Sequence, residues 1–347
     1  MPYRRLRIHA LSRKHEKKAF TLIEVMTATV IMIIIITFSL KIAVDTAAIY
    51  DAGMSSLKTA SEARVVLNAL TQDFESAVVK NDGNIWIEIN HAEAVANIPA
   101  SAAPEIMLFA PDPERRKRLA NDIERIPGTI CAIKYKIAHR SPFDNPGDYI
   151  QQIYVLYRAG IDSQGTYGMP NSAANSPLQN VLAGKTPEET WRGSAEVLDA
   201  AGVRSRKALP TWVTDIQNYK ATGIASLSLV FYFQNNVTQK LEALAHDDIG
   251  PSLNDSLRNA QVPEVTVNTY KSNVQFKAGK IIVDGTEISG TLRSIEFAVT
   301  VLSPDGDRAV RALQKQGNSP KINQERFNVI LRKYGYTFNT TVPISQQ

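Results

Sequence analysis

One apolar segment near the start of the chain limits what the sequence can fold into. Residues 20–40 form a run of 21 residues in which Glu24 is the only charge. A helix needs about 20 apolar residues to cross a bilayer, so this segment is long enough to span one. It is too long for the apolar core of a cleaved secretory signal. The sequence therefore predicts a transmembrane helix over residues 20–40.

The residues that precede this segment are strongly basic. Residues 1–19 hold seven lysines and arginines and one acid, Glu16, and without them the formal net charge falls from +5 to −1. The basic balance of the chain therefore belongs to its start and does not indicate a nucleic-acid partner. Basic residues beside a membrane span stay on the cytoplasmic side. We expect residues 1–19 to be cytoplasmic and the rest of the chain to lie across the membrane.

Glu24 lies one helical turn inside the apolar segment. An acid there costs about 2.5–3.5 kcal/mol on insertion scales, so it needs a partner. If the chain were cut between Ala19 and Phe20, Phe20 would carry an α-ammonium at the membrane surface. The Glu24 carboxylate of a neighbouring copy would neutralise that charge. Such a pair would set the register between packed helices.

The start of the apolar segment resembles the processing site of type IV prepilins and of the pseudopilins of type II secretion. That family has a basic leader, a small residue, then Phe-Thr-Leu-x-Glu and an apolar run. Phe20, Thr21, Leu22 and Glu24 match, and Ala19 stands where the family usually has glycine. The resemblance implies that prepilin peptidase cuts after Ala19 and N-methylates Phe20, and that Glu24 is the assembly glutamate.

Two other interpretations of this start are weaker. The first is an uncleaved signal-anchor helix in which Glu24 is incidental, but an unpartnered acid inside a membrane is disfavoured. The second is cleavage by signal peptidase near Ala43–Ala48, where small residues cluster, but the apolar core is too long for it.

The segment after Leu40 is amphipathic and contains no proline as far as Lys80. It predicts that one helix, about 90 Å long at 1.5 Å per residue, covers residues 20–80. Residues 41–80 would pack on a globular domain, with Gly53 as a candidate bend and 81–84 as the stop. The apolar stripe that indicates this packing is Ala63, Leu67, Leu70, Phe74, Ala77 and Val78.

Residues 84–347 are rich in strand patterns. Apolar side chains alternate with polar ones, as at Ile133, Tyr135 and Ile137, which is typical of an antiparallel sheet with one covered face. Together with the helix, this predicts an α+β fold in which a helical spine packs against an antiparallel sheet. The predicted strands are Asn84–Asn90, Glu105–Ala110, Ile130–His139, Tyr149–Ala159, Ile224–Gln234, Glu264–Tyr270, Lys280–Val283 and Leu292–Leu302.

Two polar insertions interrupt the strands, at about 160–222 and 236–262. The first reads as a long loop over 160–186 and then a helix from Thr186 to Gly202, with Thr186 at the N-cap. The second contains a predicted short helix over Gln239–Ala245. The chain then predicts a helix over Gln324–Tyr334 and an extended edge piece over Thr337–Ile344.

Several scattered residues are similar to the J-type minor pseudopilin of type II secretion. They are Arg64, Leu67 and Asp73 on the helix, Tyr135, Leu156–Arg158, and Arg293–Glu296. The layout is also similar to the predicted pilin-like proteins of the Verru_Chthon cassette. The resemblance implies a pilin-like fold and a structural role.

The sequence offers no arrangement typical of catalysis. His91, His139 and His246 lie far apart, and there is no His-Glu-x-x-His pair, phosphate loop or Gly-x-Ser-x-Gly. His246–Asp248 is better explained as a solvated turn than as a metal or calcium site. Cys131 is the only cysteine, so we expect it to be buried and unpaired. We predict no enzyme activity, no cofactor and no metal.

The densest basic run outside the leader is Arg115–Arg118. It is a candidate patch for DNA, acidic polysaccharide or lipid head groups, but no aromatic residue is interleaved for stacking on bases. A solvated face is the better explanation, and nucleic acid is not an expected partner.

The sequence therefore predicts a structural subunit, of the minor class, of a type IV pilus or a type II secretion pseudopilus. Its expected partners are prepilin peptidase, other pilin or pseudopilin subunits, the inner-membrane assembly platform and membrane lipid. We expect a single pass through the inner membrane, with the carboxyl-terminal domain periplasmic or extracellular. The alternative is a membrane-tethered adhesin or DNA-binding module that is not built into a filament. An anchored periplasmic enzyme ranks below both, and the sequence does not distinguish secretion, adhesion and uptake machines.

Overall fold

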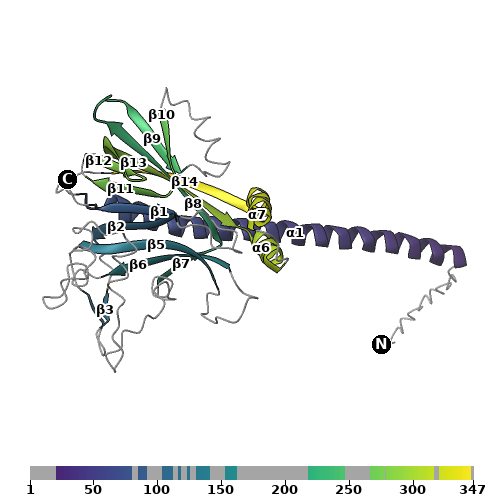
Figure 1. The fold of residues 1–347 in the computed structure, drawn as a ribbon. Helices are drawn as coiled ribbons and strands as arrows, with labels where there is room; N and C mark the ends of the chain where they lie inside the picture. The colour runs from purple at the N-terminus through teal and green to yellow at the C-terminus, as the bar shows by residue number, and fades with distance from the viewer. Residues whose placement is uncertain are drawn as a thin grey trace, which may run out of the picture. The chain divides into compact units, whose positions relative to one another are not determined.

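One helix, α1, runs from the apolar segment into the β-rich part of the chain (Figure 1). The chain divides into two compact units, Met1–Met54 and Ser55–Gln347, and α1 contributes to both. The structure is a computed structural model. It describes residues 21–79, 85–91, 104–111, 116–118, 123–125, 130–140, 153–161, 218–246, 266–277, 279–315 and 320–344.

α1 spans Leu22–Glu75, so the predicted long helix is confirmed, with an earlier end than expected. The helix ends because the next backbone amides find other partners. The N–H of Ala77 bonds the carbonyl of Phe74 at 3.2 Å, and the N–H of Val78 bonds the carbonyl of Phe109 at 2.8 Å. The chain is thereby drawn into register beside a strand. Gly53, the candidate bend, lies inside continuous helix.

A 12-stranded sheet dominates the second unit. Its order is β10-β9-β8-β13-β12-β11-β1-β2-β5-β6-β7, with β14 also paired to β13. Among the described strands only β9 and β10 run parallel, so the sheet is antiparallel-rich and consistent with the predicted α+β class. The strands are β1 (Ile87–His91), β2 (Pro104–Pro111), β5 (Ile130–Arg140), β6 (Ile153–Ile161), β7 (Tyr219–Thr222), β8 (Ile224–Asn235), β9 (Leu241–His246), β10 (Thr266–Tyr270), β11 (Asn273–Lys277), β12 (Lys280–Val283), β13 (Thr286–Leu302) and β14 (Gly335–Pro343).

All the predicted strands are present, with shifted ends, and further strands were not predicted. Those missed are β7, β9, β11 and a separate antiparallel pair, β3 (Arg116–Arg118) with β4 (Ile123–Arg125). β7 is four residues long and shows no clear period-2 pattern, whereas β11 alternates polar and apolar residues over its five positions, a signal that was not used.

The helix predicted over Gln239–Ala245 is wrong, because this segment forms strand β9. Its leucines, glutamate and alanines favour a helix when the segment is considered alone. In the fold it lies between β8 and β10, and Ala243, Leu244 and Ala245 are buried there. Pairing on both sides and burial override the local preference. The helix predicted over 186–202 lies outside the described residues, as do residues 162–186 of the predicted loop.

The core forms between the second half of α1 and one face of the sheet. The Phe74 ring of α1 lies 4.9 Å from the ring of Phe297 on β13. The predicted apolar stripe is confirmed, since Leu67 and Val78 also pack against this core as half-buried side chains. The buried members of the helix stripe are Ala63, Val66, Leu70 and Phe74.

A helical hairpin that was only half predicted completes the second unit. The missed helix α6 spans Pro304–Lys315, although its start has a recognisable pattern, with Ser303 as N-cap and Pro304 at the first position. The Ser303 hydroxyl accepts the N–H of Gly306 at 3.3 Å. The predicted second helix is confirmed as α7, Pro320–Tyr334, and the predicted edge strand as β14.

Gly335 joins α7 directly to β14, without an intervening loop. A Cβ atom at this position would lie 2.5 Å from the carbonyl oxygen of Leu331 and 2.8 Å from Cγ2 of Thr300. Only glycine lets the backbone of the last helical turn come so close to β13.

We expect Phe74→Ala to lower the free energy of unfolding of the second unit by about 3–5 kcal/mol, because it leaves a cavity between α1 and β13. Val65→Ala is the matched control, since Val65 is on the same helix and is 45% exposed. Denaturant titration of the full chain in detergent, followed by tryptophan fluorescence, measures both. Equal losses for the two variants would contradict the packing described.

Candidate functional site

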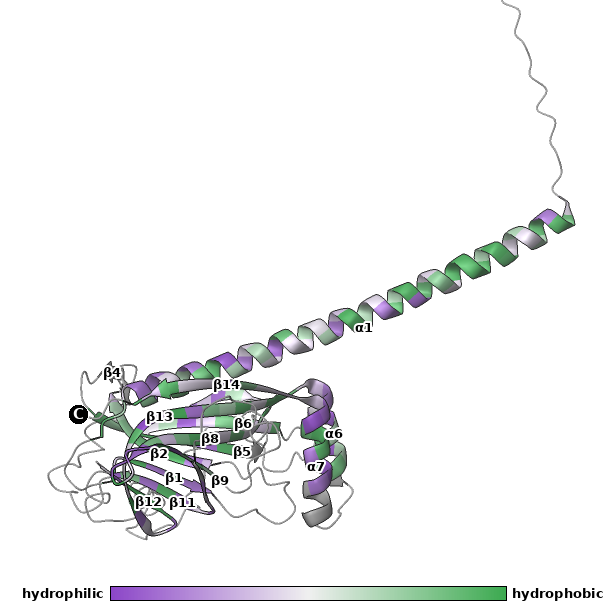
Figure 2. Cartoon of the chain, turned by 90° about the horizontal axis from the view of Figure 1, so that it is seen from above, coloured by the Kyte–Doolittle hydropathy of each residue, from purple (hydrophilic) through white to green (hydrophobic). Residues whose placement is uncertain are grey.

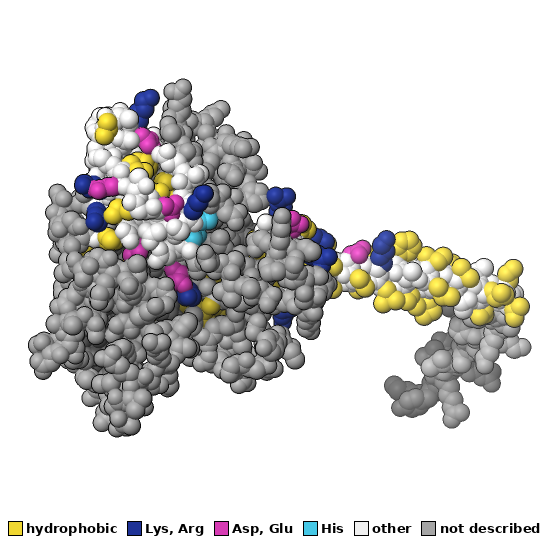
Figure 3. Space-filling view, viewed as in Figure 1, with side chains coloured by type: hydrophobic (Ala, Val, Ile, Leu, Met, Phe, Trp, Pro, Cys, Tyr) yellow, Lys and Arg dark blue, Asp and Glu magenta, His cyan; other side chains and the backbone are white. Residues whose placement is uncertain are grey.

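The first candidate site is the apolar part of α1. Every described side chain from Leu22 to Met54 is exposed, and Leu22 and Ile49 are 81% and 74% exposed. Figure 2 shows this part of the helix as mostly hydrophobic with a few hydrophilic bands, and Figure 3 shows hydrophobic side chains over most of the face in view. The helix is long and apolar enough to cross a membrane. An apolar surface of this extent needs lipid or other protein to cover it.

Three threonine hydroxyl groups within this apolar part have partners in their own helix. The Oγ1 atom of Thr27 donates to the carbonyl of Ile23 at 3.0 Å, and that of Thr37 donates to the carbonyl of Ile33 at 2.8 Å. Thr29 bonds Met26 in the same way at 2.8 Å. In hydrocarbon an unsatisfied polar group costs several kcal/mol, so these bonds make the threonines compatible with lipid.

Glu24 caps the start of α1. Its Oε2 atom accepts the N–H of Thr21 at 2.9 Å and the Thr21 hydroxyl at 3.0 Å, while Thr21 Oγ1 accepts the N–H of Glu24 at 3.3 Å. This reciprocal arrangement is a capping box. The Thr-x-x-Glu spacing predicts it, and our reasoning from sequence, which considered only a partner in another copy, missed it. Ala19 and Phe20, the predicted cleavage site, lie outside the described residues.

The second candidate site joins the spine helix to the sheet through Asp73. Arg158 donates from Nε to Asp73 Oδ2 at 2.7 Å and from Nη2 to Oδ1 at 2.8 Å. The hydroxyl of Tyr135 donates to Oδ2 of the same carboxylate. Tyr135 and Arg158 are brought side by side because they are register partners on β5 and β6. We call Asp73, Tyr135 and Arg158 the spine clamp.

The spine clamp is closed off from solvent. Asp73 is 4% exposed and Tyr135 is fully buried. Burial, together with the neighbouring Asp73 carboxylate, raises the pKa of the Tyr135 phenol well above its usual value, so the phenol remains a donor. A bidentate pair with a guanidinium is the strongest neutralisation that a buried carboxylate obtains from a side chain. The arrangement can hold two elements together, but it presents no group to a substrate.

The family resemblance pointed to these residues without predicting their contact. Asp73, Tyr135 and Arg158 were noted separately and the fold brings them together. Arg64, noted with them, is exposed, and Leu67 is half-buried against the core. Glu296, from the last matching segment, accepts the hydroxyl of Tyr232 at 2.9 Å, so it takes part in a different contact.

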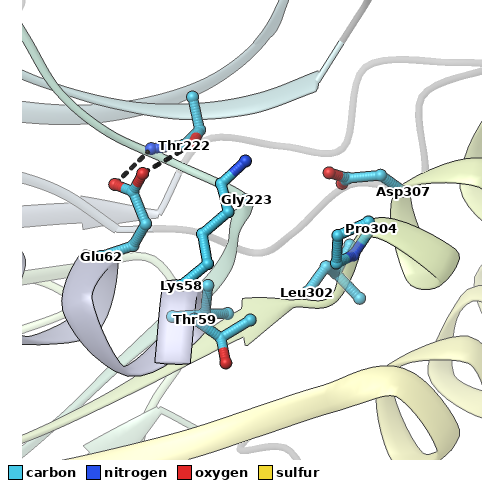
Figure 4. Close-up of a pocket in the computed structure, with 9 residues that line it drawn as sticks. Lys58, Thr59, Glu62, Thr222, Gly223, Leu302, Pro304 and Asp307 are labelled. Atoms are coloured by element: carbon cyan, nitrogen blue, oxygen red, sulfur yellow. Dashed lines mark hydrogen bonds between the residues drawn. The ribbon is translucent and has the colours of Figure 1, made fainter. Parts of the chain in front are cut away.

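A small pocket lies where α1, β7, β13 and α6 meet (Figure 4). It encloses about 20 Å³, room for about one water molecule. Glu62 on α1 accepts both the N–H and the hydroxyl of Thr222 at 3.1 Å. Gly223, with a φ of +71°, donates to Tyr154 at 2.7 Å and accepts from Leu302 at 2.8 Å. The hydrogen bonds that line this pocket connect β7 to α1. The pocket itself is too small for a substrate.

Asp307 and Lys58 also line this pocket without bonding to each other. Burial raises the pKa of the Asp307 carboxyl to about 6, against opposing effects from Arg311 and Lys58. The carboxylate is therefore more costly to ionise in the folded chain than in the unfolded chain.

A polar cluster surrounds Glu88 on β1. Its Oε1 atom accepts from Asn273 at 3.0 Å and from Gln275 at 3.1 Å, while Oε2 is buried and has no hydrogen-bond partner among the described residues. Burial raises the pKa of the Glu88 carboxyl. On the neighbouring strands Lys134 pairs with Glu105 at 2.7 Å. Positive and negative groups balance here, so the cluster does not favour a metal ion.

The structure places two of the three histidines outside the leader together. The rings of His91 and His246 stack with centroids 3.7 Å apart, and His91 bonds the hydroxyl of Tyr270 at 3.0 Å. Their separation in the sequence concealed this contact. Face-to-face rings do not direct their lone pairs at one ion, and the described residues contain no cluster of three or more potential ligands. Asp247, Asp248, His139's side chain and the side chains of Arg115–Arg118 lie outside the described part.

Cys131 is buried and forms no disulfide, as predicted. Its position on β5 keeps it from solvent, with 4% exposed.

Comparisons with protein-family models, with curated proteins and with solved structures found no match to this chain.

We expect Asp73→Asn to lower the free energy of unfolding by about 3–5 kcal/mol, because it leaves the largely buried Arg158 guanidinium without its carboxylate. Tyr135→Phe removes one hydrogen bond to a charged group and is expected to cost about 1.5–3 kcal/mol. Glu287→Gln, in the exposed pair with Lys280, is the matched control and is expected to cost less than about 1 kcal/mol. Chemical denaturation measures all three, and a loss for Asp73→Asn no larger than the control's would contradict the spine clamp.

We expect Asp307→Asn to stabilise the chain at pH 7 and to flatten part of its pH dependence. The carboxyl has a higher pKa when folded, so the folded state binds the proton more tightly and stability falls as the pH rises from about 4 to about 6. The shift of about two units corresponds to up to about 3 kcal/mol. The difference in unfolding midpoint between variant and parent, measured from pH 4 to pH 8, should grow over that window. A constant difference would refute the assignment.

Proposed function

We propose that this chain is a minor structural subunit of a type IV pilus or a type II secretion pseudopilus. Prepilin peptidase cuts between Ala19 and Phe20 and methylates Phe20. The mature chain then sits in the inner membrane by residues 20–40, with its β-rich unit on the far side, until the assembly platform adds it to a filament. The observation that carries the proposal is the exposed apolar stretch Leu22–Leu40, in which Glu24 is the only charged residue.

The role of the apolar helix follows from its surface. Its side chains from Leu22 to Leu40 are exposed, and the hydroxyls of Thr27, Thr29 and Thr37 bond within the helix, so lipid and packed helices are both suitable surroundings. A filament core made of such helices buries the same surface in other subunits. Extraction from the membrane then exchanges one apolar environment for another.

Glu24 has a place in this proposal both before and after processing. Its carboxylate already accepts from Thr21, which lies one residue after the proposed new terminus. The cap uses Oε2, and the described contacts leave Oε1 to face a second donor. The α-ammonium of Phe20 in a neighbouring subunit is the donor that we propose, because it supplies the positive charge that the cap lacks.

The spine clamp has a mechanical role in this proposal. A subunit is pulled through its helix, and the force passes to the β-rich unit through their contacts. The Asp73 carboxylate connects α1 to β5 and β6 by three hydrogen bonds. Such a contact keeps the helix from sliding along the sheet, because any displacement separates buried charges.

We expect the mature chain in cells with active prepilin peptidase to begin with N-methylated Phe20. Mass spectrometry of the amino-terminal peptide from isolated membranes measures this directly. The same cells without the peptidase should contain the intact leader, and so should an Ala19→Lys variant, which replaces the small residue at the cut. An intact Ala19–Phe20 bond despite active peptidase, or a terminus near Ala48, would overturn the proposal.

A second experiment separates the charge of Glu24 from its capping role. We expect Glu24→Gln to be processed normally but lost from filaments sheared from cells, because the amide still accepts from Thr21 but cannot neutralise an ammonium. Thr21→Ala is the matched control, since it removes the side-chain part of the cap and keeps the charge. Quantitative immunoblotting of the membrane and filament fractions compares the variants. Equal incorporation of Glu24→Gln and the parent chain would refute a role for the charge.

A further inference from the structure

One edge of β14 is open in the described chain. β14 pairs with β13 alone, and hydrogen bonds at Ser303–Tyr334 and Arg293–Ile344 lie at the two ends of this pairing. In an antiparallel pair alternate residues bond across, so the N–H and C=O groups of Thr337, Asn339 and Thr341 point away from β13. These three residues are exposed. β14 therefore offers a row of backbone donors and acceptors to a further strand.

β10 forms the opposite edge of the same part of the sheet. The order across this part is β14-β13-β8-β9-β10, and β10 pairs with β9 alone among the described strands. Residues that are paired across neighbouring strands have side chains on the same face of the sheet. One such row crosses all five strands. That row is Thr341, Glu296, Val230, Ala245 and Thr269.

The directions of the two edges make them complementary. Three antiparallel pairings and one parallel pairing separate β14 from β10, so the two strands run in opposite directions. A second copy displaced sideways, without being turned over, thus presents its β10 antiparallel to β14 of the first. Antiparallel pairing of β14 with another β14 would require one copy to be inverted, and its α1 would then point the opposite way.

Neither edge carries the charges that usually protect an open strand. β10 and β14 contain no lysine, arginine, aspartate or glutamate, and the only proline in them is Pro343 at the end of β14. Open edges in natural proteins are normally blocked by charge, proline or cover. The edge strand β7 shows such cover, because Glu62 on α1 accepts the N–H of Thr222. Among the residues that the structure describes, neither of the two complementary edges has such protection.

We infer that β10 of one copy adds to β14 of the next copy, antiparallel, so that the sheet continues from subunit to subunit. The contact is heterologous, and a heterologous contact that does not close on itself gives an open series of subunits. This inference rests on the proposed function only in that a filament supplies neighbours with the same orientation, and it applies where two copies of this chain lie next to each other. The partner in this contact is a second copy of this chain. Each copy uses its β14 edge toward one neighbour and its β10 edge toward the other.

Paired single-cysteine variants test the contact in the full chain. With Cys131→Ala as the background, Thr341→Cys and Thr269→Cys are each expressed alone and together in one cell. Cross-strand neighbours on one face lie within the range that a disulfide spans. We expect mild oxidation of the membrane and filament fractions to give a linked dimer when both variants are present, and several-fold less when either is alone.

Thr340→Cys is the matched control, because Thr340 neighbours Thr341 in sequence but points to the opposite face of β14. Together with Thr269→Cys it should give no linked dimer above background. Equal yields for Thr340→Cys and Thr341→Cys, or no linked dimer in either fraction, would overturn the inference. A dimer of Thr341→Cys alone would replace it with an inverted β14 contact.

The same samples distinguish this inference from the proposed function. If the chain enters filaments but no disulfide forms between the cysteines at 341 and 269, the proposed function is retained and the edge contact is refuted. If the linked dimer forms in membranes but the chain never enters a filament, the edge contact is supported and the filament role is refuted.

Discussion

The buried carboxylate of Asp73 is the interaction on which the arrangement of the second unit depends. It lies on the helix, and its partners Tyr135 and Arg158 lie on two adjacent strands. A buried charge is tolerated only when its partners are placed correctly, so the clamp fixes both the rotation of α1 and its position along the sheet. The apolar stripe ending at Phe74 supplies the favourable free energy of packing, but apolar contacts alone permit sliding.

The start of α1 shows the same contrast between apolar surface, which supplies packing energy, and one polar group, which sets a position. From Leu22 to Leu40 the helix has an exposed apolar surface, and Glu24, held in the capping box with Thr21, is the only charged side chain in that stretch. A carboxylate at the start of an apolar helix caps the first turn of that helix. It also gives this turn a charge that distinguishes it from the apolar turns that follow. In the proposed filament, the two acids of α1 that matter, Glu24 and Asp73, serve different partners: another subunit and the chain's own sheet.

Reasoning from sequence was most accurate where the pattern is local and strong. The long helix, its buried stripe and the strands with clear alternation follow from periodicity, which reports directly which side chains face the core. It was wrong at β9, whose composition favours a helix. It missed the short strand β7, which has no clear alternation, and β11, whose five residues do alternate between polar and apolar. It also missed α6 and the capping box at Glu24, although Ser303-Pro304 and Thr-x-x-Glu are recognisable signals. In those two cases the information was local and was not used.

The sequence by itself determined that a helix long and apolar enough for a membrane precedes a β-rich part, and that no familiar catalytic motif is present. Only the tertiary structure decided which polar residues meet: Asp73 with Tyr135 and Arg158, Glu62 with Thr222, and His91 with His246. It also decided which strands lie at the edges and in which direction they run. The physical reason is that helix and strand preferences act between residues a few positions apart, whereas these contacts join residues that are distant in the chain. Their geometry is set by the register of the whole sheet.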